Sequence, residues 1–530
     1  MNSLRYAVLA LSLVLGLTSV ALAEVVLHRG NSKEPDTLDP HRAAGVWENE
    51  IIGDMFLGLT TEAANGDIVP GSAESWTISE DGLVYTFTLR EGLFWSDGVP
   101  VTASDFVFGM RRIMDPVTAA RYASLLFPIK NARAINTGKM NPDEIGVVAL
   151  NPKTVEITLE SPVPFFTQLL AHYTTYPIPQ HAFAVHGEDW VKAGRMVTNG
   201  AYVLQEWVTN SHVKVSKNPK FYDAANVAID TVFYYPIEDS RTGLKMFETG
   251  ELDTNLMTEG FPSTMLDEVT QRLPGEARVV PSLGNRFLPM NTSKPPFDDK
   301  RVRKAVSMLV DREIINDRIV AVGARSAYAF VPPEMANHQA GAQVDFVSMA
   351  MPERVAEAKR LLSEAGYSED NPLRFELSYR GSYDNTRRLS AVAAMLRRAG
   401  VVAEIAAYDS RISYSKMDQG DYEMGDGGWH ADYNDPYNFL YLLLCDSGPM
   451  NWAKYCNPDF DMLVNEAAVT LDLEKRAQLM SQAEQIMLDD HPVIMLDYAS
   501  NRILVSNRIQ GFIDNISNAH RTRYLSFIDE

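Results

Sequence analysis

The sequence predicts an α/β protein with mixed sheets, because two kinds of hydrophobic periodicity run through the same chain. Residues 84–89, 154–159 and 213–216 alternate apolar and polar side chains, which is the pattern of half-buried strands. Other segments repeat apolar residues every three or four positions, as helices with one buried face do. Strands and helices do not follow a strict strand–helix–strand order, so we expect sheets that mix parallel and antiparallel strands.

The helical spacing is found in three segments, at residues 305–314, 355–365 and 389–396. Asp298 or Asp299 precedes the first segment and can accept hydrogen bonds from its free N-terminal amides. Gly366 follows the second segment and Gly400 the third, and glycine is common just beyond a helix end because it tolerates a left-handed backbone. We therefore expect three helices with these ends.

Length and charge limit the class of protein. A chain of 530 residues is longer than one hydrophobic core usually supports, so two or three domains are expected. The formal net charge is −21. Such a surface repels nucleic acid and anionic lipid, and no run of Lys and Arg offers a local exception. Nucleic acid is therefore excluded as a partner.

The N-terminus has the features of a cleavable secretory signal at residues 1–23. Arg5 supplies the positive end, residues 7–15 are apolar, and residues 21–23 form a small-residue cleavage site before Glu24. The apolar run is shorter than the ~20 residues of a permanent membrane span, although an uncleaved anchor is the alternative. We expect a soluble mature protein in the periplasm.

Two cysteines, Cys445 and Cys456, lie close together in the sequence. In an oxidising compartment this spacing predicts one local disulfide, and two free buried thiols are the alternative.

Sequence signatures of enzymes are absent. The chain has no Gly-x-Ser-x-Gly elbow, no His-Glu-x-x-His pair, no phosphate loop and no Gly-x-Gly-x-x-Gly turn. His181 and His186 are five residues apart, which is not a spacing that indicates a metal site. We expect no catalysis, no metal and no cofactor.

Asp432 is the most informative candidate for a binding residue. It lies between Trp429 and Tyr433, shortly after the paired glycines 427 and 428, which allow a close approach of the backbone to another segment. A carboxylate among aromatic rings is partly desolvated and needs a cation or several hydrogen-bond donors to stay ionised. Judged from these residues alone, an ordinary loop carboxylate is the simpler interpretation.

The segment around Asp432 resembles the ligand-binding stretch of the periplasmic oligopeptide-binding proteins, which are solute-binding proteins of family 5. Seven further stretches resemble the same family in order along the chain, at residues 38–41, 95–106, 198–202, 217–222, 250–253, 295–303 and 457–461. The most distinctive of them, residues 95–106, also has a structural explanation. Asp97 and Gly98 suit a tight turn, and Thr102 with Asp105 forms a helix-start box.

The resemblance implies a two-lobed periplasmic binding-protein fold of type II-like architecture, with an extra domain inserted in the first lobe. The first lobe would combine residues 24–56, 181–283 and 500–530 with the inserted domain at 57–180, and the second lobe would span residues 284–499. Hinges would then lie near Leu283 and Ala499.

The resemblance also implies a ligand site between the lobes, in which Asp432 binds the α-ammonium group of a peptide. The backbone that would pair with an extended peptide belongs to Gly428 and His430 on one lobe and to Ala44, Gly45 and Val46 on the other. Tyr122 and Trp429 match aromatic walls of the site, and ordinary core aromatics are the alternative for both.

The sequence departs from the family where a peptide carboxylate would be held. The matching basic positions are occupied by Val320, Met417 and Asp426, and no histidine is found around residues 384–386. A short peptide held at both ends is therefore doubtful, and a longer, amidated or modified peptide, or a ligand with a second cationic group, fits better. The nearby arginines 380, 387 and 388 could substitute, although a solvated helix face explains the last two equally well.

We therefore expect a monomeric extracytoplasmic receptor that delivers peptide-like ligands to the membrane permease subunits of an ABC importer. One alternative is a receptor of the same family for a non-peptide solute such as a metal chelate, a sugar or an opine. The other alternative is a secreted peptide hydrolase.

Overall fold

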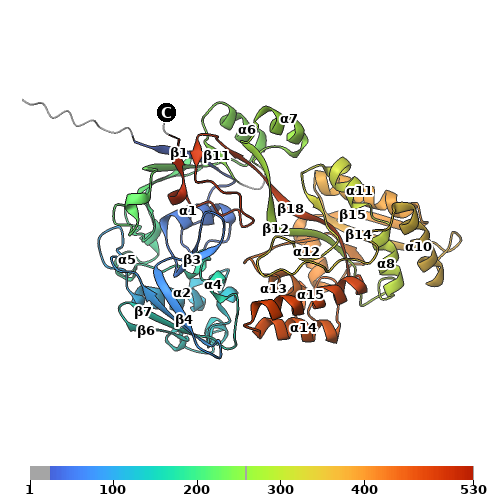
Figure 1. The fold of residues 1–530 in the computed structure, drawn as a ribbon, viewed down its shortest axis with the longest axis horizontal. Helices are drawn as coiled ribbons and strands as arrows, with labels where there is room; N and C mark the ends of the chain where they lie inside the picture. The colour runs from blue at the N-terminus through green and yellow to red at the C-terminus, as the bar shows by residue number, and fades with distance from the viewer. Residues whose placement is uncertain (1–23, 257–259, 529–530) are drawn as a thin grey trace, which may run out of the picture.

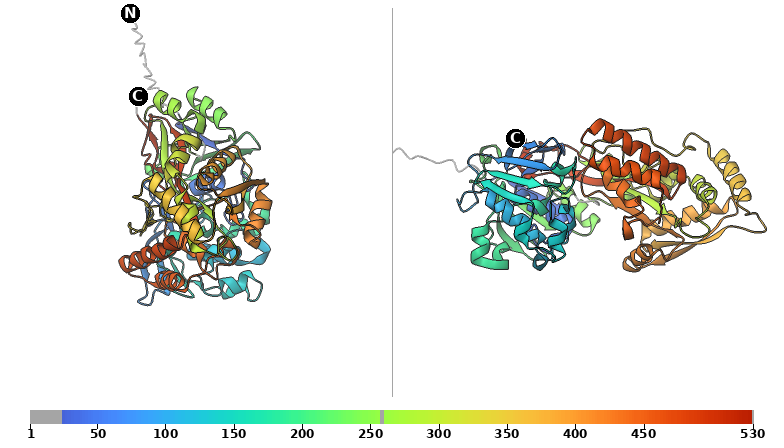
Figure 2. Two further views of the ribbon diagram at one scale, coloured as in Figure 1. Left: turned by 90° about the vertical axis from the view of Figure 1, so that its right-hand side faces the viewer. Right: turned by 90° about the horizontal axis from the view of Figure 1, so that it is seen from below.

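The chain forms two lobes that lie side by side, joined by two long strands (Figure 1). The computed structural model describes residues 24–256 and 260–528, and the signal sequence predicted for residues 1–23 lies outside this part of the chain. The joining strands are β12 (Ala277–Pro289) and β18 (Val493–Val505). Seen from below, the two lobes remain separate masses with a narrow connection between them (Figure 2).

A nine-stranded sheet passes from one lobe into the other in the order β17-β12-β18-β11-β1-β10-β9-β8, with β13 paired to β18. The remaining strands of this sheet are β1 (Val26–Asn31), β8 (Tyr202–Val208), β9 (His212–Lys217), β10 (Thr231–Pro236), β11 (Thr254–Asn255), β13 (Arg325–Ser326) and β17 (Gly427–His430). β1 is parallel to β10 and β11, whereas β12, β17 and β18 pair in antiparallel fashion. The prediction of mixed sheets is confirmed.

The ladder between β12 and β18 is interrupted at the middle of the crossing. Pro281 pairs with Ser500, and the next pair along the two strands is Asn285 with Tyr498. Leu283 and Ala499 both lie inside this interruption, where β12 and β18 are not paired with each other. That these residues act as hinges stays a prediction.

The first lobe contains a second, four-stranded antiparallel sheet. Its order is β4 (Ala73–Ile78), β5 (Val84–Leu89), β7 (Thr154–Thr158) and β6 (Val147–Asn151), and the short strands β2 (Thr60–Glu62) and β3 (Ile68–Pro70) pair beside it. The helices of this lobe are α1 (Val46–Met55), α2 (Ala103–Met114), α3 (Ala132–Asn136), α4 (Phe166–Leu169), α5 (Gln180–His186), α6 (Ser240–Glu248) and α7 (Leu266–Arg272). The three predicted strands are confirmed as β5, β7 and β9. The box at the start of α2 is also confirmed, because the Thr102 amide donates to Asp105 Oδ2 at 2.8 Å.

The second lobe surrounds a parallel sheet with helices. The sheet order is β15 (Val402–Tyr408), β14 (Arg374–Arg380) and β16 (Met424–Gly425). The helices are α8 (Lys300–Met308), α9 (Arg312–Ile314), α10 (Met351–Glu364), α11 (Tyr383–Arg397), α12 (Ser410–Gln419), α13 (Tyr437–Leu440), α14 (Pro458–Val469) and α15 (Leu473–Asp490). Its buried apolar cluster extends from Leu283 to Tyr498 and is distinct from the main cluster of the first lobe. Each lobe therefore has its own core, while the exact boundaries given above stay predictions.

The predicted helix at 305–314 is wrong in its continuity. α8 starts after Asp299, which caps it as expected, but it ends at Met308. The Asp311 side chain then accepts a hydrogen bond from the Ile314 amide at 3.0 Å and caps a new short helix. Ile314, which was expected on the buried face, is 39% exposed. The other two helices end as predicted, with positive φ at Gly366 and Gly400.

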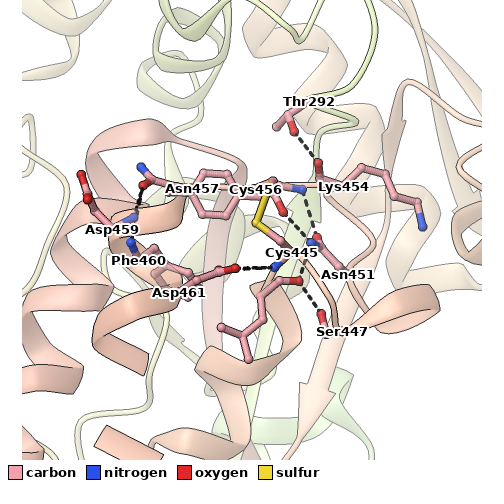
Figure 3. Close-up of a disulfide and its surroundings, with 12 residues drawn as sticks. Thr292, Cys445, Ser447, Asn451, Lys454, Cys456, Asn457, Asp459, Phe460 and Asp461 are labelled. Carbon is pink, nitrogen blue, oxygen red and sulfur yellow. Dashed lines mark hydrogen bonds between the residues drawn. A yellow bond between two sulfur atoms is a disulfide. The ribbon is translucent and has the colours of Figure 1, made fainter. Parts of the chain in front are cut away.

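The predicted disulfide between Cys445 and Cys456 is confirmed, and it closes the loop before α14 (Figure 3). The Cys445 amide donates to the carboxylate of Asp461 on α14, and Asn451 inside the loop donates to the Tyr455 carbonyl at 2.6 Å. The loop is therefore tied to the helix that follows it. In the part of the chain that the structure describes, no helix is both long and apolar enough to cross a membrane.

Candidate functional site

A cleft between the lobes brings most of the predicted site residues together. A cavity of about 460 Å³, the cleft cavity, is lined by Ala44, Gly45, Val46 and Tyr122 from the first lobe and by His430 and Asp432 from the second. An adjoining cavity of about 1120 Å³, the aromatic cavity, is lined by Trp429 together with Asp432 and Tyr122. Asp432 and Tyr122 therefore stand where the two cavities meet. Gly428 lines neither cavity and lies in β17.

The loop that carries Asp432 is anchored before this residue by β17 and after it by the contacts of Asn434 and Asp435. β17 ends at His430, and the chain then turns toward α13. Asp435 forms a two-pronged ion pair with Arg476, at 2.6 and 2.7 Å, and both side chains are fully buried. Asn434 Oδ1 accepts a hydrogen bond from the Ala336 amide at 2.9 Å. These contacts fix the loop without involving the Asp432 carboxylate.

Asn438, the second residue of α13, connects the two predicted side chains of this loop. Its amide oxygen accepts a hydrogen bond from Trp429 Nε1 at 2.7 Å and a longer one from the Asp432 amide at 3.4 Å. Asn438 is buried, and it orients the indole relative to the carboxylate. Asn438 was not predicted, because nothing in the local sequence marks an asparagine six positions after Asp432 as its partner.

The Asp432 carboxylate has no ion pair with any lysine or arginine among the described residues. Solvent reaches it from the cleft, yet the surrounding protein desolvates it enough to raise its pKa to about 6. The phenols of Tyr122 and Tyr173 from the first lobe and Tyr441 from the second have raised pKa values, mainly through burial and further through the charge of Asp432. An anion bounded by aromatic rings and lacking a counter-ion is suited to bind a small cation.

The predicted aromatic walls are both half-buried and face the cavities. Tyr122 packs against His172 and Tyr173, with ring centroids 5.3 and 6.3 Å away. Trp429 meets Tyr441 edge to face at 6.3 Å. One wall therefore comes from each lobe.

β17 forms the edge of the large sheet, so one side of its backbone is not paired within the sheet. The Ala431 amide donates to the Leu283 carbonyl of β12 at 2.8 Å. Because successive residues of a strand direct their backbone groups to opposite edges, Gly428 and His430 present theirs to the free edge. The predicted close approach at the paired glycines is confirmed, since a Cβ on Gly428 would lie 2.9 Å from the Asn285 carbonyl oxygen.

On the opposite lobe, the backbone at residues 44–46 is partly occupied. The amides of Ala44 and Gly45 donate to the Glu48 carboxylate at 2.9 and 2.6 Å, and the Gly45 carbonyl accepts from two amides of the first turn of α1. This role of Glu48 was not predicted from the sequence. Among the described residues, the Ala44 carbonyl and the Val46 amide make no hydrogen bond, so they are the groups left to meet a ligand.

The three residues at the family's basic positions do not line either cavity. Val320 and Met417 belong to the core of the second lobe, and buried Asp426 accepts hydrogen bonds from Arg380 Nε at 3.2 Å and Asn385 Nδ2 at 3.0 Å. The arginines named beside them differ from each other. Arg387 lies on the helix surface, as a solvated helix face requires, but for Arg388 that interpretation is wrong because this side chain is buried.

Two lobes with separate cores, joined by paired strands, are the architecture of an extracellular solute-binding receptor. The chain belongs to the bacterial extracellular solute-binding proteins of family 5, whose sequence profile matches residues 67–451. The two-lobed fold implied by the resemblance is thus confirmed.

The relatives of this chain in the family are named after different ligands. The chain is 37% identical to the periplasmic oligopeptide-binding protein OppA of Escherichia coli, over 93% of this chain and 91% of OppA. It is also 37% identical to the probable deoxycholate-binding periplasmic protein YgiS of the same bacterium, over 92% of this chain and 90% of YgiS.

Two solved structures of relatives differ in how well they superpose on this chain. The unliganded open form of the murein tripeptide-binding protein MppA gives a TM-score of 0.87 at 32% identity and covers 96% of this chain and 98% of MppA. Haemophilus influenzae OppA in complex with the peptide RPPGFSPFR has the same identity and covers 96% of this chain and 99% of its own, but its TM-score is 0.76. The arrangement of lobes described here is closer to the open, unliganded structure.

Proposed function

We propose that the protein is the periplasmic receptor of an ABC importer and that it binds oligopeptides or peptide-like ligands between its two lobes. The observation that carries the proposal is the Asp432 carboxylate, which lacks a basic partner among the described residues and faces the cleft between aromatic walls. The ligand's ammonium group supplies the missing cation. A charge-assisted hydrogen bond of this kind contributes roughly 1.5–3 kcal/mol.

The free edge of β17 supports binding of an extended backbone. A peptide that runs along this edge adds a strand to the sheet, and the carbonyl and amide groups of Gly428 and His430 pair with it whatever its side chains are. The Ala44 carbonyl and the Val46 amide meet the ligand from the first lobe. Main-chain pairing with loosely filled side-chain space is the arrangement expected of a receptor with broad peptide specificity.

Lobe closure follows from the same contacts. In the open arrangement the first lobe contributes Tyr122 and residues 44–46 to the cleft, and the second contributes Asp432 and β17. A ligand that touches both sets stabilises the closed form more than the open one, which is the condition for ligand-driven closure. The closed receptor, acting as a monomer, then meets the permease subunits.

The proposal is tested by native mass spectrometry after incubation with a mixture of short peptides and their N-acetylated copies. We expect the protein to retain peptides with a free amine, to reject the acetylated copies, and to return every peptide with its mass unchanged. Shortened peptides would indicate a hydrolase instead, and retention of both sets alike would contradict the assigned role of the amine.

A second candidate function is binding of an amphipathic non-peptide ligand, and the aromatic cavity is the observation that favours it. This cavity is larger than the cleft cavity, and Phe127, Phe165, Tyr437 and Met450 add apolar surface to it. The relative YgiS is described as a probable deoxycholate-binding protein. Competition between deoxycholate and a free-amine peptide, measured by calorimetry, distinguishes the two: displacement of the peptide would favour this candidate.

A further inference from the structure

The binding loop, residues 431–436, rests against a part of the second lobe that has no regular structure. Residues 327–350, between β13 and α10, form turns but no helix or strand. Asn337 Nδ2 in this part donates to Asp435 Oδ2 at 3.3 Å, and the amide of the preceding residue makes the contact to Asn434 described above. Because neither a helix nor a sheet holds these residues, their position depends on contacts made by side chains.

Glu484 of α15 holds the first part of this region, residues 330–337, which we call the bracing segment. Its Oε1 accepts hydrogen bonds from the amides of Phe330 and Val331 at 2.7 and 2.8 Å. The Glu484 residue is 1% exposed, and no lysine or arginine among the described residues forms an ion pair with it. His338 Nε2 lies 4.0 Å from Oε2, beyond hydrogen-bond distance. The two amides are therefore the groups that this buried carboxyl group holds.

Keeping a carboxyl group in the core of the second lobe costs free energy. Burial raises the pKa of Glu484 to about 7, because the surrounding protein desolvates the charged form. An apolar side chain would avoid this cost but could not accept the two amide hydrogen bonds. Glu484 lines neither the cleft cavity nor the aromatic cavity, so any effect on the ligand must pass through the bracing segment.

Phe330 connects this anchor to both ends of the binding loop. Its carbonyl accepts a hydrogen bond from Asn285 Nδ2 at 2.6 Å, and Asn285 pairs with Trp429 of β17, just before the loop. Its ring meets Phe439 of α13, just after the loop, edge to face with the centroids 6.1 Å apart. The residues on both sides of the binding loop are therefore held in place through Phe330.

One helix carries both anchors of the loop. Arg476 of α15 holds Asp435 directly, and Glu484 follows Arg476 by eight residues on the same helix. Residues with this spacing belong to one broad face of a helix. α15 lies beside α13, the helix that follows the loop (Figure 1). The helix thus holds the loop directly through Arg476 and indirectly through Glu484.

We propose that Glu484 is a positioning residue for the amine site: by holding the bracing segment, it fixes the binding loop where Asp432 meets the ligand's ammonium group. This inference rests on the proposed function, in which Asp432 holds that group. A hydrogen bond weakens steeply when its geometry is disturbed, so a small shift of the loop affects the amine contact more than the rest of the ligand. The affinity ratio of a free-amine peptide to its N-acetylated copy, the amine preference, therefore reports this role.

The test measures the amine preference by calorimetry on the full-length protein and three variants. The unmodified protein should show a preference of at least about tenfold. Glu484→Leu removes the acceptor and should lower the preference about fivefold or more. Glu484→Gln should keep it, because both amides bond to one oxygen, which a glutamine carbonyl can replace. Gln482→Leu, at an exposed position of the same helix, is the control and should also keep it.

A merely structural role would give a different result. If Glu484→Leu lowered the melting temperature but kept the amine preference, or weakened both ligands alike, the inference would be overturned. Loss of the preference in Glu484→Gln would also overturn it, because this variant retains the acceptor. If the unmodified protein itself showed no amine preference, the proposed function would fall together with the inference.

Hydrogen exchange of the unmodified protein covers the case in which Glu484→Leu does not fold. Coupling between two sites is reciprocal, so a ligand that orders the binding loop should also stabilise the bracing segment. Saturating free-amine peptide should slow exchange of the Phe330 and Val331 amides, although neither residue lines the two cavities. Slower exchange in the binding loop with unchanged exchange at these two amides would overturn the inference and leave the proposed function standing.

Discussion

At the scale of single residues, the proposed function depends on Asp432, whose loop is held by contacts that do not involve a counter-ion to its carboxylate. Asp435 with Arg476 and Asn438 with Trp429 hold the loop, so the carboxylate can remain without a basic partner among the described residues. The carboxylate is exposed to the cleft, and desolvation by the surrounding protein raises its pKa to about 6, so the anion is less well solvated there than in bulk water. In the proposed function, an arriving ammonium group compensates for this lost solvation.

The raised pKa predicts that affinity for free-amine peptides depends on pH. Asp432 becomes protonated as the pH falls through about 6, while the peptide amine stays charged, so affinity should drop about tenfold for each pH unit below 6. The bound ammonium lowers the pKa of Asp432, and binding near pH 6 should therefore release protons. Calorimetry between pH 4.5 and 7.5, in buffers of different ionisation enthalpy, measures both effects. Asp432→Asn should show neither, and a flat profile for the unmodified protein would contradict the assignment.

How far the sequence predicted the site depends on the kind of contact. Asp432, Trp429 and the backbone around Gly428 lie in one continuous stretch, so a sequence pattern could identify them. Asn438 and Tyr441 follow in a region without such a pattern, and Tyr173 and Glu48 come from the other lobe. Their roles depend on how segments pack in space, which periodicity does not encode.

At the scale of elements, the proposed function assigns the ligand-facing side of the second lobe to the free edge of β17 and the loop after it. β17 is held by β12 alone, and the glycines at 427 and 428 let the two strands approach closely. The strands were predictable from alternation, but the helix at 305–314 was not continuous. Asp311 interrupts it because a carboxylate that caps free amides can end one helix and begin another, whereas the apolar spacing runs on regardless.

The disulfide provides a prediction at this scale. Cys445 and Cys456 close a loop with a sequence separation of 11, and neither residue lines the cavities described above. Replacing both by serine should lower the free energy of unfolding by about 3 kcal/mol, through the larger freedom of the unfolded chain, without changing ligand affinity. Chemical denaturation and calorimetry measure the two quantities. Unchanged stability together with weakened binding would assign the disulfide to the site instead.

At the scale of the whole molecule, two independent cores are connected by a ladder that is interrupted at Leu283 and Ala499. The lobes also touch away from this crossing. Phe165 of the first lobe stacks on Tyr433 at 4.6 Å and on Tyr437 at 5.6 Å. Tyr433 follows Asp432 in the sequence, so the proposed amine site lies next to a contact between the lobes.

This arrangement predicts compaction on binding. Small-angle X-ray scattering of the unliganded protein should fit the open structure, and the radius of gyration should decrease with saturating free-amine peptide, because contacts to both lobes favour the closed form. Asp432→Asn should remain open at the same peptide concentration. A scattering profile that is unchanged at saturation would argue against closure.

The measurement that tests the central claim most directly is a calorimetric cycle of two proteins and two ligands. The unmodified protein and Asp432→Asn are each titrated with one peptide and with its N-acetylated copy. If the carboxylate holds the amine, removing either partner weakens binding about tenfold or more, and removing the second adds little further loss. If the two losses simply add, or if Asp432→Asn binds the free-amine peptide as tightly as the unmodified protein does, the ligand's amine is held elsewhere.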